Sequence, residues 1–141
     1  MLSREFFGSF AGLGRWTDIT GESRSYRIVY LQFEADDDAI VLRFFHDLHE
    51  EDDEVIAEFR FDFRDEHAFS VSSIAGEQRQ SLGSGHAFRD FCQYCLVIGD
   101  MMVENRLVLY EGRLHVFGSS SRNQQGRFIH WEEVLEPDLL A

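Results

Sequence analysis

A strict two-residue alternation of apolar and charged side chains is the feature that most limits how this chain folds. Successive side chains of a β-strand point to opposite faces, so such alternation gives one buried and one solvated face. Residues 55–63 show it most clearly, because Glu58, Arg60 and Asp62 separate apolar neighbours. The apolar face consists of Val55, Ala57, Phe59, Phe61 and Phe63. Residues 40–48 repeat the pattern, which predicts a second strand joined to the first through the acidic run 50–54.

The same pattern recurs along most of the chain and predicts an all-β protein. Turn-like separators such as Gly99-Asp100 interrupt it, and Glu111-Gly112 favours a tight hairpin. Residues 76–90 fit either a loop or a weak strand. We expect strands at 15–19, 25–34, 40–48, 55–63, 67–74, 91–98, 102–110, 113–120 and 126–132.

These strands follow one another with short connections, and no predicted helix is long enough for a parallel crossover. Closure of such a meander protects its edge strands. We therefore expect an antiparallel up-and-down β-barrel of about eight to ten strands, with a two-sheet sandwich as the alternative. Near the N-terminus, apolar residues recur at spacings near three and four, which predicts a short helix or turn over 2–13 that plugs one end of the barrel. These residues are Leu2, Phe6, Phe7, Phe10 and Leu13.

Composition places the chain among ordered proteins. The 141 residues suffice for one domain over 1–141, and a hydrophobic content of 44% excludes a disordered chain. The start lacks the apolar stretch of a signal peptide, and no run is long enough to span a bilayer, so we expect a cytoplasmic protein. Two cysteines are too few for a disulfide framework, which agrees with a reducing compartment.

The charge balance limits the partners of the chain. Asp and Glu number 26 against 13 basic residues, all of them arginine, and the formal net charge is -13. A surface of this sign repels phosphate groups, so we expect neither nucleic acid nor a membrane as a partner. Two explanations of the composition stay open: an arginine-biased genome, or adaptation to high salt.

Gly14-Arg15-Trp16 is a G-x-W motif that precedes the series of strands. With a short plug before it and an up-and-down barrel after it, the chain resembles the calycin superfamily, which includes lipocalins, fatty-acid-binding proteins and nitrobindin-like haem proteins. The resemblance implies that Trp16 is buried at the closed end of the barrel beneath an arginine. Arg127 is the matching arginine, and Arg122 is the second choice.

The resemblance also suggests what such a barrel holds. Lipocalin-like and fatty-acid-binding barrels hold small apolar or amphiphilic molecules. Nitrobindin-like barrels ligate haem through a histidine, for which His46, His115 and His130 are the candidates here. We expect no cofactor, and haem remains a lesser alternative. The chain departs from secreted lipocalins in its lack of a signal peptide and of a disulfide pattern.

Other groups of reactive residues do not form a recognisable catalytic or metal site. Cys92 and Cys95 are spaced as C-x-x-C, but on a strand these two positions face opposite sides, so we expect two strand cysteines with one packed inside. His46 and His49 precede the acidic run, whose spacing does not match a calcium loop. No nucleophile is paired with a base, so we expect a binding protein rather than an enzyme.

Polar residues on apolar stripes are the better functional candidates, because a barrel that binds an amphiphile needs inward polar groups. The candidate ligand-binding residues are Arg27, Tyr30, Phe44, His46, Phe59, Tyr94, Arg106, His115 and Trp131. The inward face of strands 25–34 and 102–110 stays open at this point. The leading expectation is non-enzymatic binding of a small apolar or amphiphilic molecule. The alternatives are a filled barrel that acts through its acidic surface or a homodimer interface, and a barrel-mouth enzyme or haem protein.

Overall fold

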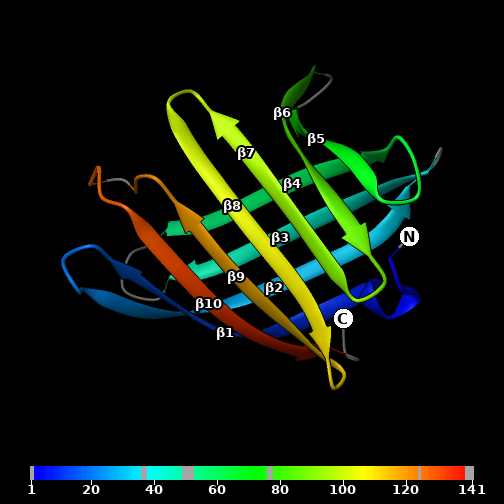
Figure 1. Ribbon diagram of the computed structural model, residues 1–141. Coiled ribbons are helices and arrows are strands. Elements are labelled where there is room, and N and C mark those ends of the chain that lie inside the picture. The colour runs from blue at the N-terminus through cyan, green and yellow to red at the C-terminus, as the bar shows by residue number, and fades with distance from the viewer. Residues whose placement is uncertain (1, 36–37, 49–52, 76–77, 124, 139–141) are drawn as a thin grey trace.

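The strands form one closed antiparallel barrel in which each strand pairs with its neighbours in sequence, and β1 also pairs with β10 (Figure 1). This computed structural model describes residues 2–35, 38–48, 53–75, 78–123 and 125–138, without the side chains of 46–48, 53–56, 74–75 and 78. The strands are β1 (Gly8–Asp18), β2 (Ser23–Ala35), β3 (Ala39–Leu48), β4 (Asp53–Phe63), β5 (Ala68–Ala75), β6 (Gln78–Phe88), β7 (Phe91–Ile98), β8 (Met101–Tyr110), β9 (Arg113–Ser120) and β10 (Ile129–Pro137). The expected all-β up-and-down barrel is confirmed.

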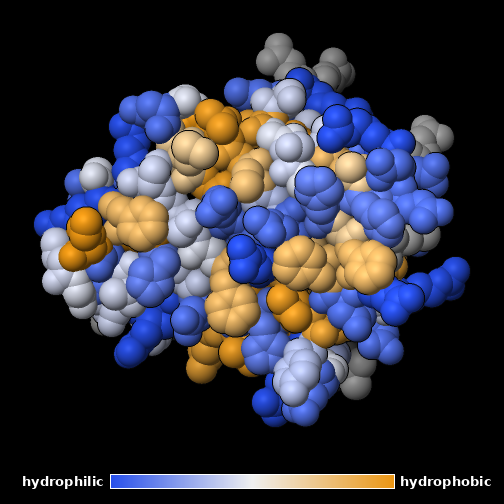
Figure 2. All heavy atoms as spheres, in the orientation of Figure 1, coloured by the Kyte–Doolittle hydropathy of each residue, from blue (hydrophilic) through white to orange (hydrophobic). Residues whose placement is uncertain are grey.

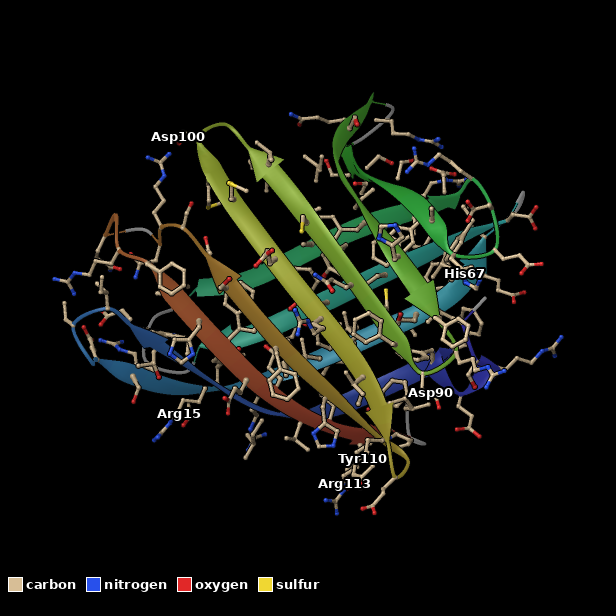
Figure 3. All side chains as sticks on the ribbon, in the orientation of Figure 1. Arg15, His67, Asp90, Asp100, Tyr110 and Arg113 are labelled. Atoms are coloured by element: carbon tan, nitrogen blue, oxygen red, sulfur yellow. The ribbon has the colours of Figure 1, made fainter. Side chains whose placement is uncertain are left out.

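A short 3-10 helix, η1 (Arg4–Phe6), covers one end of the barrel, which we call the plug end. Phe6 is completely buried, and the Ser3 amide donates to the Arg89 carbonyl at 2.8 Å. Figure 1 shows this N-terminal segment beside the turn between β6 and β7. The turn between β8 and β9 lies at the same end, whereas Asp100 lies at the opposite or far end (Figure 3).

The expected helix or turn over 2–13 is shorter than its apolar spacing indicates, because β1 already begins at Gly8. Leu13, which the helical spacing placed with Phe6 and Phe10, is 65% exposed. The buried positions of β1 are instead Phe10, Gly14 and Asp18, which follow the even-numbered alternation of a strand. The small residues Gly8, Gly12 and Gly14 hid this alternation, since glycine contributes no hydropathy signal.

Two further strand boundaries differ from the sequence-based expectation. Residues 78–88 form a full strand that pairs with both β5 and β7, and it contains three small residues among its inward positions. The last strand begins at Ile129 and runs to Pro137, rather than covering 126–132. Its longer course brings Glu133 and Leu135 into the barrel wall.

Trp16 does not lie at the plug end. Its Cα lies opposite Arg24 and Trp131, close to the turn between β1 and β2, and its side chain is only half-buried. The expectation that the motif tryptophan fills the closed end is therefore wrong. Phe6 and Phe10 are the buried aromatic residues of that N-terminal region instead, because η1 enters β1 from the plug end.

Among the described residues, no helix has the length and apolar character that a membrane crossing requires.

The turn between β8 and β9 contains strain that a substitution should relieve. Glu111 and Gly112 both have positive φ, at 52° and 75°, which fits the type I′ hairpin that the sequence predicts. Glutamate is unfavourable in this left-handed region, whereas asparagine tolerates it. We expect Glu111→Asn to raise the free energy of unfolding in urea by roughly 0.5–1 kcal/mol. Glu111→Val should lower it, and equal stabilities of the two variants would contradict this account of the turn.

Candidate functional site

A buried carboxyl group on the inner wall is the centre of the candidate site. Glu133 on β10 is 1% exposed. The Tyr26 hydroxyl donates to its Oε2 at 2.5 Å, and the Tyr30 hydroxyl donates to its Oε1 at 2.8 Å. Both tyrosines come from β2, which is separated from β10 by β1. The three side chains therefore join two strands that do not pair with each other.

Gly14 of the G-x-W motif makes this contact possible. Its Cα lies between those of Tyr26 and Glu133 in the sheet register. A Cβ at Gly14 would lie 2.6 Å from the Tyr26 ring and 2.8 Å from Cγ of Glu133, closer than such atoms approach. The absence of a side chain at this position thus leaves the space through which tyrosine reaches the carboxyl group. Arg15, between the two motif residues, points away from the barrel (Figure 3).

A second polar chain is built in the same way on the adjoining strands. The Trp131 Nε1 donates to Oδ1 of Asn105 at 3.1 Å, and the Asn105 Nδ2 donates to the Tyr94 hydroxyl at 2.9 Å. Gly118 lies between Trp131 and Asn105 in the register. A Cβ there would lie 2.2 Å from the Trp131 ring, so this glycine also provides the space for a side chain that spans a strand.

Aromatic rings surround these polar groups on the β3–β5 side of the interior. Tyr30 contacts Phe44 with ring centroids 5.8 Å apart, and Phe44 contacts Phe59 at 5.6 Å. Phe59 and Phe61 of β4 both contact Tyr94 of β7, at 6.2 Å and 5.2 Å. Because β5 and β6 lie between β4 and β7, these contacts join strands that do not pair with each other.

Burial changes the acid–base properties of the carboxyl group and its neighbours. Desolvation raises the pKa of Glu133 from 4.5 to about 7, and the hydrogen bonds from Tyr26 and Tyr30 only partly oppose that rise. Desolvation, with the charge of Glu133 as the next cause, also raises the pKa of both tyrosines well above its usual range. The tyrosines therefore stay protonated and act as donors while Glu133 titrates near neutral pH.

Five of the residues that the sequence nominated for ligand binding come together in the interior. Tyr30, Phe59 and Tyr94 are buried, and Phe44 and Trp131 are half-buried against the core. They join in the two polar chains and the aromatic cluster, which are adjacent to one another through Tyr30 and Tyr94.

Three other nominated residues do not point inward. Arg27 and Arg106 are exposed on the outer face. His115 also faces outward, because its two neighbours in the strand, Leu114 and Val116, are the buried, inward residues. The strand 102–110 thus turns its Val103–Leu109 face inward. The reason is burial cost: this face is apolar apart from Asn105, whereas the other carries Glu104 and Arg106.

The histidines proposed for haem also lie mostly outside. His130 is exposed on β10, and His115 faces outward, so neither side chain reaches the interior. The side chain of His46 lies outside the described residues. Cys92 is buried and Cys95 faces outward toward Glu104, as expected for two cysteines on one strand. Desolvation raises the pKa of the Cys92 thiol to about 12.

Arg127 has a different partner from the one that the family resemblance implied. Its guanidinium pairs with Asp18 at 3.2 Å and with Glu22 at 3.7 Å. Asp18 also accepts from the Thr20 hydroxyl, and that bond is the first cause of its lowered pKa. Arg122, the second choice, pairs with Asp100. Arg127 therefore fastens the turn between β1 and β2 at the far end.

Sequence reasoning missed several polar residues of the described interior, among them Tyr26, Gln32, Asn105 and Glu133. Tyr26 and Gln32 share the even-numbered face of β2 with Tyr30, which was itself nominated. Glu133 lies beyond the end of the predicted last strand. The alternation of Trp131, Glu133 and Leu135 was the available signal, but a glutamate among apolar residues is normally assigned to solvent.

The glycine of the G-x-W motif gives a direct test of this geometry. We expect Gly14→Ala to lower the free energy of unfolding by roughly 1–3 kcal/mol, because the added methyl group overlaps the Tyr26 ring and Glu133. The adjacent Leu13→Ala, at an exposed position, should change it by less than about 0.5 kcal/mol. Urea denaturation measures both, and equal effects would show that the space at Gly14 is not needed.

The buried carboxyl group predicts a specific pH dependence of stability. Since the pKa of Glu133 is higher in the folded state, the native protein binds more protons between about pH 4.5 and 7. The stability that comes from the protonated Glu133 is therefore fully present below pH 4.5, and it is lost as the pH rises from there through about 7.

We expect wild-type protein to lose on the order of 3 kcal/mol relative to Glu133→Gln between pH 5 and 8. The exposed neighbour Glu132 supplies the matched control, because Glu132→Gln makes the same change of charge on the outer face. Parallel urea-denaturation profiles of wild type and Glu133→Gln across this range would contradict the prediction.

Comparisons with known proteins define the fold. No protein-family model matches this chain, and no curated protein matches its sequence. Among solved structures, an S-type phycobiliprotein lyase from Guillardia theta aligns with a TM-score of 0.71 at 10% identity, over 97% of this chain and 90% of that one. The protein Rv2717c from M. tuberculosis aligns with a TM-score of 0.70 at 10% identity, over 96% and 94%. The likeness is one of fold, and both alignments cover nearly the whole of this closed antiparallel β-barrel.

Proposed function

We propose that this barrel binds a small apolar or amphiphilic molecule in its interior without converting it chemically. The observation that carries the proposal is Glu133, a carboxyl group that is 1% exposed on the inner wall and held there by Tyr26 and Tyr30. Burial of a carboxyl group opposes stability near neutral pH, so its presence in a barrel interior favours a recognition role.

The rest of the described inner wall supports an amphiphilic ligand. Aromatic and aliphatic side chains supply most of its surface, and a few amide and hydroxyl groups supply polarity. The arginines that were expected to meet a ligand, Arg27 and Arg106, are outside. Recognition of a polar group therefore falls to tyrosine, asparagine, glutamine and glutamate side chains, which form directional hydrogen bonds.

The fold by itself does not decide between binding and catalysis, because one fold supports many functions. One protein with this fold is named a lyase. Here burial keeps the Cys92 thiol and the Tyr26 and Tyr30 hydroxyls protonated, so these described side chains form no thiolate or phenolate nucleophile near neutral pH. The described side chains therefore favour ligand binding over catalysis.

A filled barrel that acts through its outer surface is the second candidate. The contacts of Tyr94 with Phe59 and Phe61 across the interior favour it, because they occupy space that a ligand needs. The outer face of β7–β10 also presents hydrophobic side chains among charged ones (Figure 2). These include Val97, Met102, Phe117 and Val134, each at least 45% exposed.

Titration with N-phenyl-1-naphthylamine, a neutral fluorophore that brightens in apolar surroundings, separates the two candidates. We expect saturable binding of one probe per barrel with a Kd in the micromolar range, on the order of 10⁻⁶ M. Leu107→Trp, which adds volume inside, should weaken binding at least about tenfold, whereas Met102→Trp on the outer face of the same strand should not. Circular dichroism checks that both variants fold. A wild-type protein that shows no saturable signal would support the filled barrel instead.

A further inference from the structure

The side-chain amide of Gln32 is a buried polar group without a hydrogen-bond partner. Gln32 is 1% exposed, and its Nε2 contacts no acceptor in the described part of the chain. The alternation of β2 places it on the inner face with Tyr26, Ile28 and Tyr30, toward the plug end. A buried amide without a partner is costly, because it gives up its hydrogen bonds to water and gains none in the protein. Most buried polar groups in proteins are hydrogen-bonded for this reason.

The residues around Gln32 explain why the protein itself leaves it unsatisfied. Its two cross-strand neighbours are Gly8, which has no side chain, and Leu42, which is apolar and completely buried. The nearest inward hydroxyl on its own strand, that of Tyr30, donates to Glu133 and does not accept from the Gln32 Nε2. Ser72 Oγ is the other buried atom without a partner in the described chain, but it lies beside the bulge of β5, where the ladder is irregular.

We propose that Gln32 is a ligand-binding residue whose amide donates a hydrogen bond to a carbonyl or similar acceptor oxygen at the deep end of an amphiphilic ligand. This inference rests on the proposed binding function and specifies the ligand class. The acceptor group of the bound ligand then lies toward the plug end, beside the cross-strand neighbours of Gln32, Gly8 and Leu42. An apolar molecule of the same shape leaves the amide unsatisfied and binds more weakly.

Replacement of a residue whose polar group is satisfied only by a ligand has opposite effects on stability and on ligand binding. Replacement of an unsatisfied buried amide by an apolar side chain of similar shape removes the desolvation penalty of the empty protein. Gln32→Met should therefore stabilise the protein and weaken ligand binding together. A glutamine that serves only the fold would show the reverse effect on stability and none on binding.

The binding experiment compares two competitors of equal shape. 2-Undecanone carries a carbonyl oxygen, and 2-methyl-1-undecene replaces that oxygen by a methylene group. Each is titrated against bound N-phenyl-1-naphthylamine in wild type, Gln32→Met and Gln93→Met. Gln93 lies on the outer face of β7, so it controls for the chemical change alone. Thermal unfolding without ligand is measured for all three proteins.

We expect wild type and Gln93→Met to prefer the ketone to the alkene by about tenfold, as one net hydrogen bond implies. Gln32→Met should lose this preference and bind the ketone no better than the alkene, because the carbonyl oxygen then has no donor, and it should unfold at a Tm roughly 3 °C higher. Equal binding of ketone and alkene by wild type would overturn the role of Gln32 and leave the proposed function intact. A lowered Tm of Gln32→Met with an unchanged preference would show that bound water satisfies the amide, and would also overturn it. Failure of the fluorophore and both competitors to bind any of the proteins would end the proposed function and this inference together.

Discussion

The hydrogen bond between Tyr26 and Glu133 across Gly14 is the interaction on which the interior of this barrel depends. It joins β2 to β10 over a strand that contributes no side chain at that point. Tyr30 adds a second donor to the same carboxyl group. Because Glu133 lies almost completely out of water, the hydrogen bonds from Tyr26 and Tyr30 offset part of the cost of its burial. The geometry of one glycine thus fixes the position of the polar centre.

The same construction, a large side chain that spans a strand over a glycine, recurs around the wall. Trp131 lies over Gly118, and a Cβ at Gly85 would lie 2.6 Å from the Phe69 ring. Inward glycines leave space for these rings beside the wall. Aromatic rings gather where Tyr94 meets Phe59 and Phe61, and hydrogen-bonding side chains lie on β2, β7, β8 and β10. The proposed ligand would use both kinds of group.

Local pattern was enough to predict most strands and the class of the fold, but it failed where small residues replaced large ones. The alternation of residues 55–63 predicted β4, and Glu111-Gly112 predicted the hairpin between β8 and β9. The pattern missed the first half of β1, and it did not decide between a loop and a weak strand in the region of β6, because glycine and serine give no hydropathy contrast. The G-x-W motif predicted Trp16 at the plugged end of a barrel, yet this residue lies at the end opposite the plug. A three-residue pattern does not specify which end of a strand meets a helix.

The sequence by itself determined that the chain alternates, turns and closes without helices, because strand periodicity and turn residues act between near neighbours. It also indicated Tyr30, Phe44, Phe59, Tyr94 and Trp131 as members of one inner surface. Only the tertiary structure decided that Arg27 and Arg106 face outward and that Glu133 faces inward, since the choice of face depends on the whole register of the closed sheet. It alone decided that Gln32 meets glycine and leucine across the strands and keeps an unsatisfied amide. Hydrogen-bond satisfaction is a property of neighbours in space, and spacing along the chain does not contain it.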